Sequence, residues 1–586
     1  MEQWVLLRKG ADFEGIAKKF HISPRLACLI RNRDIIGDEA LELYLNGKLS
    51  GLSDGNLMKD MERAVSILKK KIEEHKKIRV IGDYDIDGVN ATYILLEGLC
   101  SLGADADSDI PDRIKDGYGL NMELIERAYK DGTDTIVTCD NGIAAAEEIA
   151  HGKSLGMTVI VTDHHEVPFE ENDGERCYKL PPADAVIDPK QADCGYPFKG
   201  LCGAAVAYKL MEKLYESFGR DVAELSYLIE NVAIATVGDV MDLVGENRIL
   251  VKEGLSRLCN TKNLGMEALI DCTGIDRNHI GAYHIGFVLG PCLNAGGRLD
   301  TAKRSLALLR AKTWQEAKHQ AEELKALNDS RKDMTEQAVT QAAKLVEEHS
   351  GAMDRVLVLY LPDCHESLAG IVAGRIRERY ARPVIILTDA EHDVKGSGRS
   401  IEAYHMYEEL NQCRGLLEKF GGHKLAAGLT LKKDNVDSLR LMLNENCTLT
   451  KEDMAEKVSI DMEMPFSCVT EEFVSELELL EPFGKGNTKP VFAARDISLL
   501  EGRILGKNHN VVKLRVRDRE HTSIDAMFFG DTEIFLDYLE KKFGAGAKER
   551  LFSGRTKGME LSVTYYPGIN DYQGRRTPQI VITHYR

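Results

Sequence analysis

Apolar residues recur in different ways along this chain, and each way predicts a different kind of element. Up to about residue 75 the spacing is helical, since the stretch NLMKDMERAVSILKKKIEEHKK places its apolar residues on one helix face. From Ile78 the pattern changes to short apolar runs that end in polar residues and lead into helical stretches: IRVIGDYD, DTIVTCD, TVIVTDHH and DAVIDP. This alternation predicts the α/β class, with a parallel sheet covered by helices.

The remainder of the chain divides in the same manner. A polar-faced segment over residues 314–349 predicts a connecting helix, and residues 350–455 repeat the α/β pattern on a smaller scale, including the glycine-rich GSGRS and GGHKLAAG. Residues 456–586 are rich in short strands separated by polar turns, which suits a small β-barrel of the oligonucleotide-binding (OB) type. Ahead of these parts we predict a helical lead-in, 1–75, and a larger α/β domain, 76–313.

Composition narrows the class of protein. The 586 residues are 43% hydrophobic and 29% charged, and no apolar run is long enough to span a bilayer. The thirteen cysteines form no CxxC pair, so neither a zinc ribbon nor a disulfide framework is indicated. The opening MEQWVLLRKGADFEGIAKKF lacks the features of a secretory signal. We therefore expect a cytoplasmic protein with reduced thiols and no membrane segment.

The net charge of −18 argues at first against a nucleic-acid partner, because binding to phosphates depends on Lys and Arg. That argument is only partial. A basic groove can coexist with an acidic exterior, and a carboxylate metal site itself adds negative charge. The charge excludes a uniformly basic surface but not a local DNA-binding one.

Acidic residues and histidines gather where the predicted strands end. Asp83, Asp85 and Asp87 alternate at the end of the first apolar run, and strand spacing would put their side chains on one face. The later runs and one helical stretch end in further candidates: Asp140, Asp163, His164, His165 and Asp239. Because the carboxyl ends of parallel strands share one crevice, these side chains should converge. Such a density suits two divalent ions about 3.5 to 4 Å apart, whose charge is offset by bridging carboxylates.

Each piece has a simpler interpretation when taken alone. An aspartate at a strand end is often a helix N-cap, and a His-His pair is often part of a polar loop. Together, however, four or more buried carboxylates would repel one another strongly without cations, so metal binding explains the cluster best. The mixture of oxygen and imidazole ligands favours manganese over magnesium, and we expect two Mn²⁺ or Mg²⁺ ions per site.

Four motifs, GDYDIDG, TCDNGI, TDHHEVP and TVGDVMDL, make the chain resemble the DHH phosphoesterase superfamily. Three further segments, IPDRIKDGYGL, PCLNAGGRLDTAKRSLALL and LEPFGKGNTKPVF, narrow the resemblance to the RecJ family over roughly residues 50–586. The resemblance implies a DHH domain, a DHH-associated (DHHA1) domain and an OB domain. It also implies a 5′-to-3′ exonuclease that hydrolyses single-stranded DNA to mononucleotides in DNA repair and recombination.

The same resemblance assigns roles to the clustered residues. The implied metal ligands are Asp85, Asp87, Asp140, His164 and Asp239. Asp83 is implied to be a further ligand or a nearby hydrogen-bond acceptor, and His165 to face the scissile phosphate. The implied catalytic set is His165, Asp163 and Asp83. Ile81 stands where some relatives, such as pyrophosphatases, have a metal-binding histidine, which leaves the role of Asp83 open.

Substrate-binding residues are implied by further motifs. The implied set is Arg113, Arg298, Ser397, Arg399, Gly421, Gly422 and His423. The last three belong to GGHKLAAG, which resembles a phosphate-binding loop, although a tight glycine turn is an equally good interpretation without the resemblance. Arg113, Ser397 and Arg399 resemble the pocket that reads the 5′ end, where a guanidinium fork fits a terminal phosphate. Arg298 would touch the strand backbone or cap a helix.

Other functions remain open on these residues. The same chemistry could act on short oligoribonucleotides or cyclic dinucleotides, and a chain without catalysis could serve as a nucleic-acid-binding scaffold. The barrel could bind protein, but basic residues around Phe483 and Phe492 favour DNA: Lys485, Lys489, Arg503, Lys507, Lys513, Arg515 and Arg517. We expect a monomer that acts on single-stranded DNA with a 5′ end, together with a helicase and a single-strand-binding protein.

Overall fold

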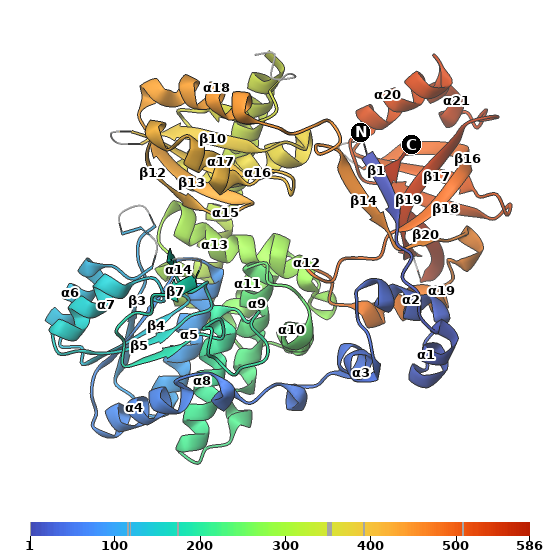
Figure 1. Ribbon diagram of the computed structural model, residues 1–586. Helices are drawn as coiled ribbons and strands as arrows, with labels where there is room; N and C mark the ends of the chain where they lie inside the picture. The colour runs from blue at the N-terminus through green and yellow to red at the C-terminus, as the bar shows by residue number, and fades with distance from the viewer. Residues whose placement is uncertain are drawn as a thin grey trace. The chain divides into compact units, whose positions relative to one another are not determined.

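The helices and strands fall into two units in a computed structural model (Figure 1). The structure describes residues 2–113, 116–117, 119–172, 175–348, 354–390, 393–506, 509–572 and 574–586. The first unit comprises 52–241 and 250–456, and the second comprises 2–51, 242–249 and 457–586. No helix in the described ranges is both long and apolar enough to cross a bilayer.

The first unit is built on a parallel sheet with the strand order β3-β2-β4-β5-β8. Its strands are β2 (Ile78–Gly82), β3 (Ala106–Asp109), β4 (Thr135–Cys139), β5 (Thr158–Thr162) and β8 (Ala185–Ile187). Every residue of β2 and β4 is buried, as expected for parallel strands covered on both faces. The predicted α/β fold with a parallel sheet is confirmed.

Helices cover both faces of this sheet. Figure 1 shows α6 (Met122–Lys130) and α7 (Ala146–Ser154) on one face and α5 (Ile86–Ser101) and α8 (Gly203–Ser217) on the other. The unit also contains α4 (Met61–Glu73), the hairpin β6 (Phe169–Asn172) and β7 (Glu175–Tyr178), α9 (Ile229–Gly238), α10 (Gly245–Leu258, its first turn grouped with the second unit), α11 (Leu264–Thr273), α12 (Ala282–His284), the π-turn η5 (Ile285–Leu289), α13 (Gly290–Leu299) and α14 (Lys303–Leu309).

A single long helix, α15 (Trp314–Glu348), leads to a second, smaller sheet in the same unit. This sheet has the order β12-β13-β11-β10-β9, with β9 and β10 parallel and the other pairs antiparallel. Its elements are β9 (Leu357–Tyr360), α16 (Ala369–Tyr380), β10 (Val384–Asp389), β11 (Val394–Arg399), α17 (Met406–Gln412), β12 (Leu417–Gly422), β13 (Ala426–Leu431) and α18 (Val436–Asn446). These elements occupy the part of the chain where the α/β pattern of the sequence recurs on a smaller scale.

The second unit contains a barrel, because the sheet β15-β16-β17-β18-β20-β19 closes through an additional pairing of β16 with β19. Its elements are β14 (Glu456–Ile460), β15 (Met462–Glu463), α19 (Glu471–Leu477), β16 (Phe492–Leu505), β17 (Val511–Arg517), β18 (Ser523–Phe528), α20 (Thr532–Phe543), α21 (Ala547–Phe552), β19 (Glu560–Tyr572) and β20 (Arg575–Tyr585). Five strands form the closed barrel, which confirms the predicted OB-type fold.

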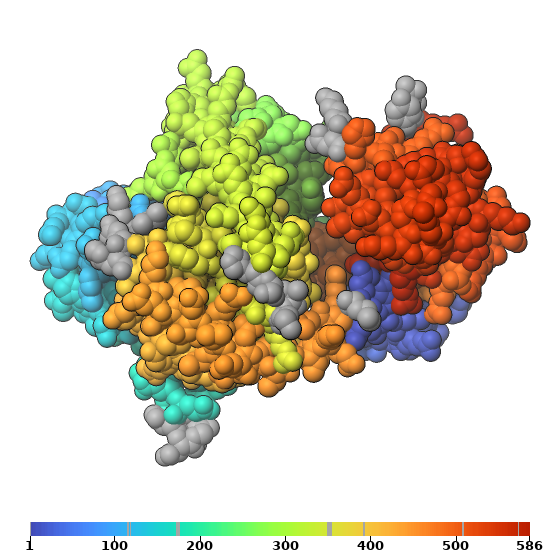
Figure 2. All heavy atoms as spheres, turned by 90° about the horizontal axis from the view of Figure 1, so that it is seen from above, coloured from blue at the N-terminus to red at the C-terminus, as the bar shows by residue number. Residues whose placement is uncertain are grey.

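The N-terminal segment differs from a purely helical lead-in. It begins with a strand, β1 (Glu2–Leu6), which pairs with β14. Helices α1 (Phe13–Phe20), α2 (Pro24–Asn32) and α3 (Asp38–Asn46) follow, and apolar side chains of α2 and α3 are buried in one cluster with the barrel core. Figure 1 shows this blue segment beside the orange and red strands, and Figure 2 shows blue atoms beside the orange and red ones of the same unit. Residues 2–51 therefore complete the core of the second unit.

Two expectations about the barrel need correction or restriction. Phe492 is fully buried and stacks on Tyr565 at 5.9 Å between ring centroids, so it cannot meet a nucleic acid base. Along a strand, alternate side chains face inward, and Phe492 occupies an inward position of β16. Lys507 lies outside the described residues.

The motif EPFGKGN also has a structural role, since buried Asn487 donates hydrogen bonds to the carbonyls of Leu480 and Pro482.

Candidate metal centre and adjoining pocket

The DYDID segment brings its aspartates together through a turn. Strand β2 ends at Gly82, so the three aspartates do not share a strand face as their spacing suggested; Asp87 lies in the first turn of α5. Asp85 caps that helix, with Oδ1 accepting from the backbone N–H groups of Asp87 at 2.9 Å and Gly88 at 3.1 Å. A Cβ at Gly88 would lie 2.4 Å from the carbonyl oxygen of Asp83, so the tight turn requires glycine.

Asp87 is held by a second helix from a distant part of the sequence. Its two carboxylate oxygens accept hydrogen bonds, each 2.7 Å long, from the backbone N–H groups of Gly203 and Ala204 at the start of α8. The positive end of that helix partly offsets the charge of Asp87. A Cβ at Gly203 would lie 2.7 Å from the Cβ of Asp140, so only glycine permits this approach. Sequence reasoning missed Gly203, although it stands at the start of the helical run GAAVAY.

His164 lies at the centre of the remaining carboxylates. Its Nε2 is 3.0 Å from Oδ1 of Asp140, 3.5 Å from Oδ2 of Asp87 and 3.8 Å from Oδ2 of Asp239. Three groups of three residues each have ligand atoms within 4.8 Å of one another inside the group: Asp140, His164 and His165; Asp87, His164 and Asp239; and Asp83, Asp85 and Asp140. The structure thus brings together every residue of the expected ligand set.

Asp163 contributes in another way, because both of its oxygens accept hydrogen bonds. Oδ1 is 2.7 Å from Nδ1 of His165 and accepts from the backbone N–H groups of His164 and His165 at 2.7 and 3.2 Å. Oδ2 accepts from the N–H of Ile143 at 2.9 Å. Asp163 therefore fixes the His-His turn and orients the His165 ring.

The electrostatics of the cluster fit divalent cations. Burial, followed by the nearby charge of Asp85, raises the pKa of Asp83 to about 8 and that of Asp87 to about 7. Burial, followed by the charge of Asp87, likewise holds the pKa of Asp140 well above its usual value. Oδ2 of Asp83 is buried and has no hydrogen-bond partner in the described part of the chain. These carboxylates cannot all be ionised at once unless positive charge lies nearby. Together with an imidazole, they form a set of ligands that suits metal ions.

The two histidines differ in charge. Burial, together with the charge of His165, lowers the pKa of His164 to about 3, so its ring is neutral and suited to ligate a metal. Burial opposes protonation of His165 as well, but the hydrogen bond and charge of Asp163 outweigh it and raise the pKa of His165 to about 9. The pair therefore offers one neutral ligand and one cationic hydrogen-bond donor.

A polar cavity of about 600 Å³ lies between the two α/β parts of the first unit. Four predicted substrate-binding residues line it: Arg113, Arg298, Ser397 and Arg399. Arg399 donates from Nη1 to Oγ of Ser397 at 3.2 Å. A Cβ at Gly370 of α16 would lie 2.7 Å from Arg399 and 2.9 Å from Ser397, so glycine keeps this wall of the cavity open.

Tyr84 connects the cavity to the aspartate turn, and sequence reasoning missed it. It lies between Asp83 and Asp85 and lines the cavity, with the guanidinium of Arg113 5.1 Å from its ring centroid. The alternation D-Y-D is the signal that could have found it, since a residue between two clustered aspartates must face elsewhere.

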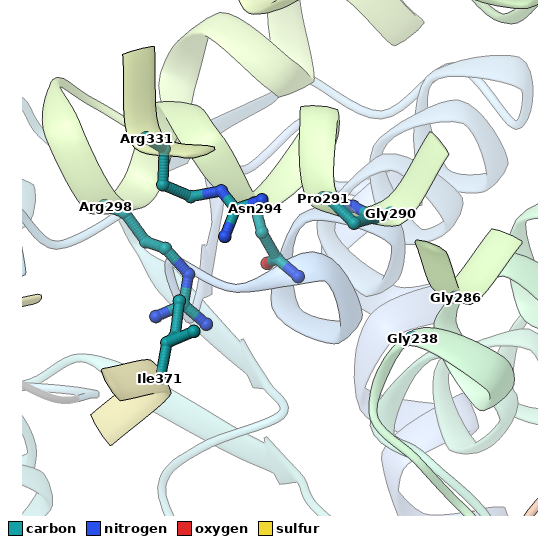
Figure 3. A pocket seen from close by; sticks show the side chains of 8 residues that line it. All are labelled: Gly238, Gly286, Gly290, Pro291, Asn294, Arg298, Arg331 and Ile371. Carbon is teal, nitrogen blue, oxygen red and sulfur yellow. The ribbon is translucent and has the colours of Figure 1, made fainter. Parts of the chain in front are cut away.

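A second, smaller cavity of about 190 Å³ adjoins the first, because Arg298 and Ile371 line both. Figure 3 shows the side chains of Arg298, Arg331 and Asn294 on one side and Gly238 and Gly286 on the other. Gly238 directly precedes Asp239 in the chain. The position of Arg298 supports contact with a ligand, although its Nη1 also donates to the carbonyl oxygen of Ser367 at 3.2 Å.

The GGH motif lies apart from these cavities. Gly421 and Gly422 end the edge strand β12, and both are exposed, as is His423. Gly421 is paired with Gly428, which in turn lies opposite Ser397 and lines the larger cavity. The motif is thus one strand removed from the cavity wall.

The barrel carries basic residues on the neighbouring strands β16, which contains Arg503, and β17, which contains the other three. Lys513 and Arg515 both form ion pairs with Asp525, at 2.8 and 2.6 Å, whereas Arg503 and Arg517 are exposed. Two of these four positive charges, those of Lys513 and Arg515, are therefore partly neutralised by Asp525 within the barrel.

Three family models match the chain. They are the DHH family N-terminal domain over residues 77–236, the DHHA1 domain over 353–448 and the RecJ OB domain over 460–584.

Curated proteins named single-stranded-DNA-specific exonuclease RecJ are similar over almost the whole chain. The protein from Bacillus subtilis is 35% identical over 99% of this chain and 70% of its own length. The protein from Escherichia coli is 33% identical over 99% of both.

Among solved structures, RecJ from Thermus thermophilus in complex with Mn²⁺ matches with a TM-score of 0.81 at 26% identity, covering 100% of this chain and 79% of that chain. The same protein in complex with Mg²⁺ matches with a TM-score of 0.76 at 25% identity, covering 100% and 78%. These similar structures carry the two metals expected here, and the acidic clusters of this chain can hold metal ions.

The pKa shifts of the cluster predict how pH changes the stability of the metal-free protein. Asp83 and Asp87 have pKa values raised to about 8 and 7, so the folded chain holds protons that the unfolded chain has released. His165, with its pKa raised to about 9, also holds a proton above pH 6.5 that the unfolded chain has released. His164, with its pKa lowered to about 3, has the opposite effect on stability, and it does so mainly below pH 6.5. With chelator present, the free energy of unfolding should fall from pH ~6.5 to ~8, by about 1.4 kcal/mol per pH unit for each proton held.

Denaturant unfolding in chelator at several pH values checks this, with Asp83→Asn as the comparison, whose slope should be shallower. Saturating Mn²⁺ should remove or reverse the fall, because the metal binds the deprotonated carboxylates. Stability that is constant or rises over this window in chelator contradicts the electrostatic description.

Proposed function

Because the chain belongs to the RecJ family of single-stranded-DNA-specific exonucleases, we propose that it hydrolyses single-stranded DNA stepwise from the 5′ end. The observation that carries this proposal is the arginine- and serine-lined cavity that Tyr84 joins to the carboxylate cluster. A terminal phosphate held by these arginines would present the linkage nearest the 5′ end to the metal ligands. Mononucleotides would then leave one at a time.

Two divalent ions would be held by Asp83, Asp85, Asp87, Asp140, His164 and Asp239. When bound, they supply activation of water and stabilisation of the charge that develops on the phosphate. The side chains of this chain set the geometry: the start of α8 fixes the carboxylate of Asp87, and Asp85 is fixed by capping α5. Little rearrangement would be needed when the ions bind.

His165 would donate a hydrogen bond to the scissile phosphate. Asp163 engages its Nδ1 at 2.7 Å, so Nε2 is the atom that would meet the substrate, and the raised pKa keeps the ring charged near pH 7. The side chain is 44% exposed, unlike that of His164 at 6%, as a group that meets substrate should be. A cation placed there would stabilise the phosphate in the transition state.

The larger cavity would read the 5′ end. Burial lowers the pKa of Arg399, as do the nearby charges of Arg377 and Arg113, so bringing a phosphate into the cavity relieves repulsion between cations. An arginine fork fits a phosphate dianion, and Ser397 adds a hydroxyl. The side chains that enclose this end of the site would exclude a second strand, which supports specificity for single-stranded DNA.

The barrel would bind the same strand as a separate element, with Arg503 and Arg517 on its exposed face. An enzyme limited to single strands needs a source of them, so we include a helicase and a single-strand-binding protein as partners, with the chain acting as a cytoplasmic monomer. The GGH motif, one strand from the cavity, would contact the phosphate backbone beyond the first nucleotide.

Replacing a ligand of the cluster should abolish hydrolysis while leaving the fold intact. For Asp140→Asn or His164→Ala we predict a loss in kcat of about a thousandfold or more, since each removes part of the metal charge stabilisation, worth several kcal/mol. The measurement is digestion of end-labelled single-stranded DNA with Mn²⁺, scoring polarity and product length. Asp333→Asn, in an exposed aspartate of α15, is the matched control.

The metal-free Asp140→Asn protein should be at least as stable as wild type, because a repelled carboxylate is removed. Activity retained in either ligand variant, or wild-type preference for dinucleotides over a long 5′-phosphorylated strand, contradicts the proposal.

The 5′-end pocket makes a separate prediction. Arg399→Ala should raise KM for 5′-phosphorylated single-stranded DNA about 10- to 100-fold, the loss of a charged hydrogen bond worth about 1.5–3 kcal/mol. It should affect a 5′-hydroxyl strand much less. Arg379→Ala, an exposed arginine of α16, should change neither. Equal losses on the two substrates would show that Arg399 does not read the terminal phosphate.

A further inference from the structure

Two aromatic rings lie on the surface of the first unit. Tyr283 is 64% exposed and Phe287 is 68% exposed, which makes them two of the most exposed large hydrophobic side chains among the described residues. Their rings stack with centroids 5.0 Å apart and an interplanar angle of 28°. Neither ring belongs to the core, and both side chains are largely open to solvent. We call this pair the aromatic ledge.

The backbone beneath the ledge has an unusual geometry. The N–H of Gly290 donates to the carbonyl oxygen of Ile285, five residues earlier, which defines the π-turn η5. A Cβ at Gly290 would lie 2.6 Å from that oxygen, so glycine permits the turn. The one extra residue in the turn rotates the helix face before it by about 100° relative to the face after it. As a result Ala282, Ile285 and Leu289 are buried while the two rings project outward. Such π-turns occur frequently at functional sites.

The ledge adjoins the site already described. Gly286 lies between the two aromatic residues in the chain and lines the smaller cavity together with Gly238 and Arg298 (Figure 3). Gly238 precedes Asp239, a member of the acidic cluster, and Arg298 also lines the larger cavity. A strand whose 5′ end occupies the larger cavity and whose backbone follows Arg298 and Arg331 would leave past η5. Because the rings adjoin the cavities, a strand bound in the cavities would also cover the rings.

We propose that the aromatic ledge stacks bases of the single-stranded substrate just downstream of the nucleotide being removed. The inference rests on the proposed exonuclease function and adds a binding site to it. Every base has a π-face, so stacking is tolerant of sequence, as an exonuclease needs. Exposed rings beside a phosphate-binding cavity lose contact with water when a base covers them, whereas the sugar-phosphate backbone remains with the arginines. The ledge thereby positions the strand and takes no part in the chemical step.

The test moves one abasic nucleotide along a 5′-phosphorylated twelve-nucleotide strand and measures KM and kcat with Mn²⁺ for each substrate. Wild type should show a rise in KM of roughly five- to a hundredfold when the abasic nucleotide reaches the ledge, and no rise at the 3′ end. The double variant Tyr283→Ala with Phe287→Ala should show the raised KM on every strand and no dependence on the abasic position. kcat should stay unchanged throughout. The single variant Phe287→Trp, which keeps an aromatic ring at this position, should show the wild-type profile.

Two controls separate the ledge from a merely structural effect. Tyr129→Ala removes another exposed tyrosine, 49% exposed on α6, and should leave the profile unchanged. A trinucleotide, too short to reach the ledge, should be hydrolysed equally by wild type and the double variant. If wild type hydrolyses both substrates but the double variant keeps its abasic dependence, or loses kcat on the trinucleotide, the ledge does not bind DNA. If wild type hydrolyses neither, the exonuclease function itself is wrong.

Discussion

Mutual repulsion among buried carboxylates at the carboxyl edge of the parallel sheet is the constraint on which the rest of this structure depends. Asp83, Asp87 and Asp140 are nearly inaccessible to water, and each has a pKa raised by burial and by neighbouring charge. Such a cluster persists only where the surrounding fold holds it and where positive charge compensates it. The chain supplies part of that charge through the start of α8 and through His165, and divalent cations would supply the remainder.

The same constraint explains the glycines of the site. Gly88 lets the turn after Asp83 fold back on itself, and Gly203 lets α8 approach until its N–H groups reach Asp87. Gly370 and Gly290 have related roles around the two cavities, where a side chain would fill space or block a turn. Backbone close to backbone brings charged groups from distant segments together without long, mobile side chains. The cluster is thus preorganised by packing.

Much of this arrangement could be predicted from the sequence, because strand ends of a parallel sheet share one edge and because acidic residues and histidines are conspicuous there. The reason given for Asp83, Asp85 and Asp87 was nevertheless incomplete: they converge through a strand-to-helix turn, which alternation alone cannot distinguish from a continued strand. Gly203 was missed because its contact with Asp87 spans 116 positions. Phe492 was misinterpreted because neighbouring basic residues suggested a surface, whereas strand alternation turns this ring inward. The pairing of β1 with β14 joins the start of the chain to residues 456–460, far away in the sequence, and leaves no local signal.

The most direct test of the account is the number of Mn²⁺ ions that the intact chain binds. Calorimetric titration should give two ions for wild type and for Asp163→Asn, since both oxygens of Asp163 serve as hydrogen-bond acceptors that orient the His-His turn. Asp239→Asn, which removes an outer member of the cluster, should lose or greatly weaken one ion. A single ion in wild type, or loss of an ion in Asp163→Asn with two retained in Asp239→Asn, would contradict the two-metal centre described for this fold.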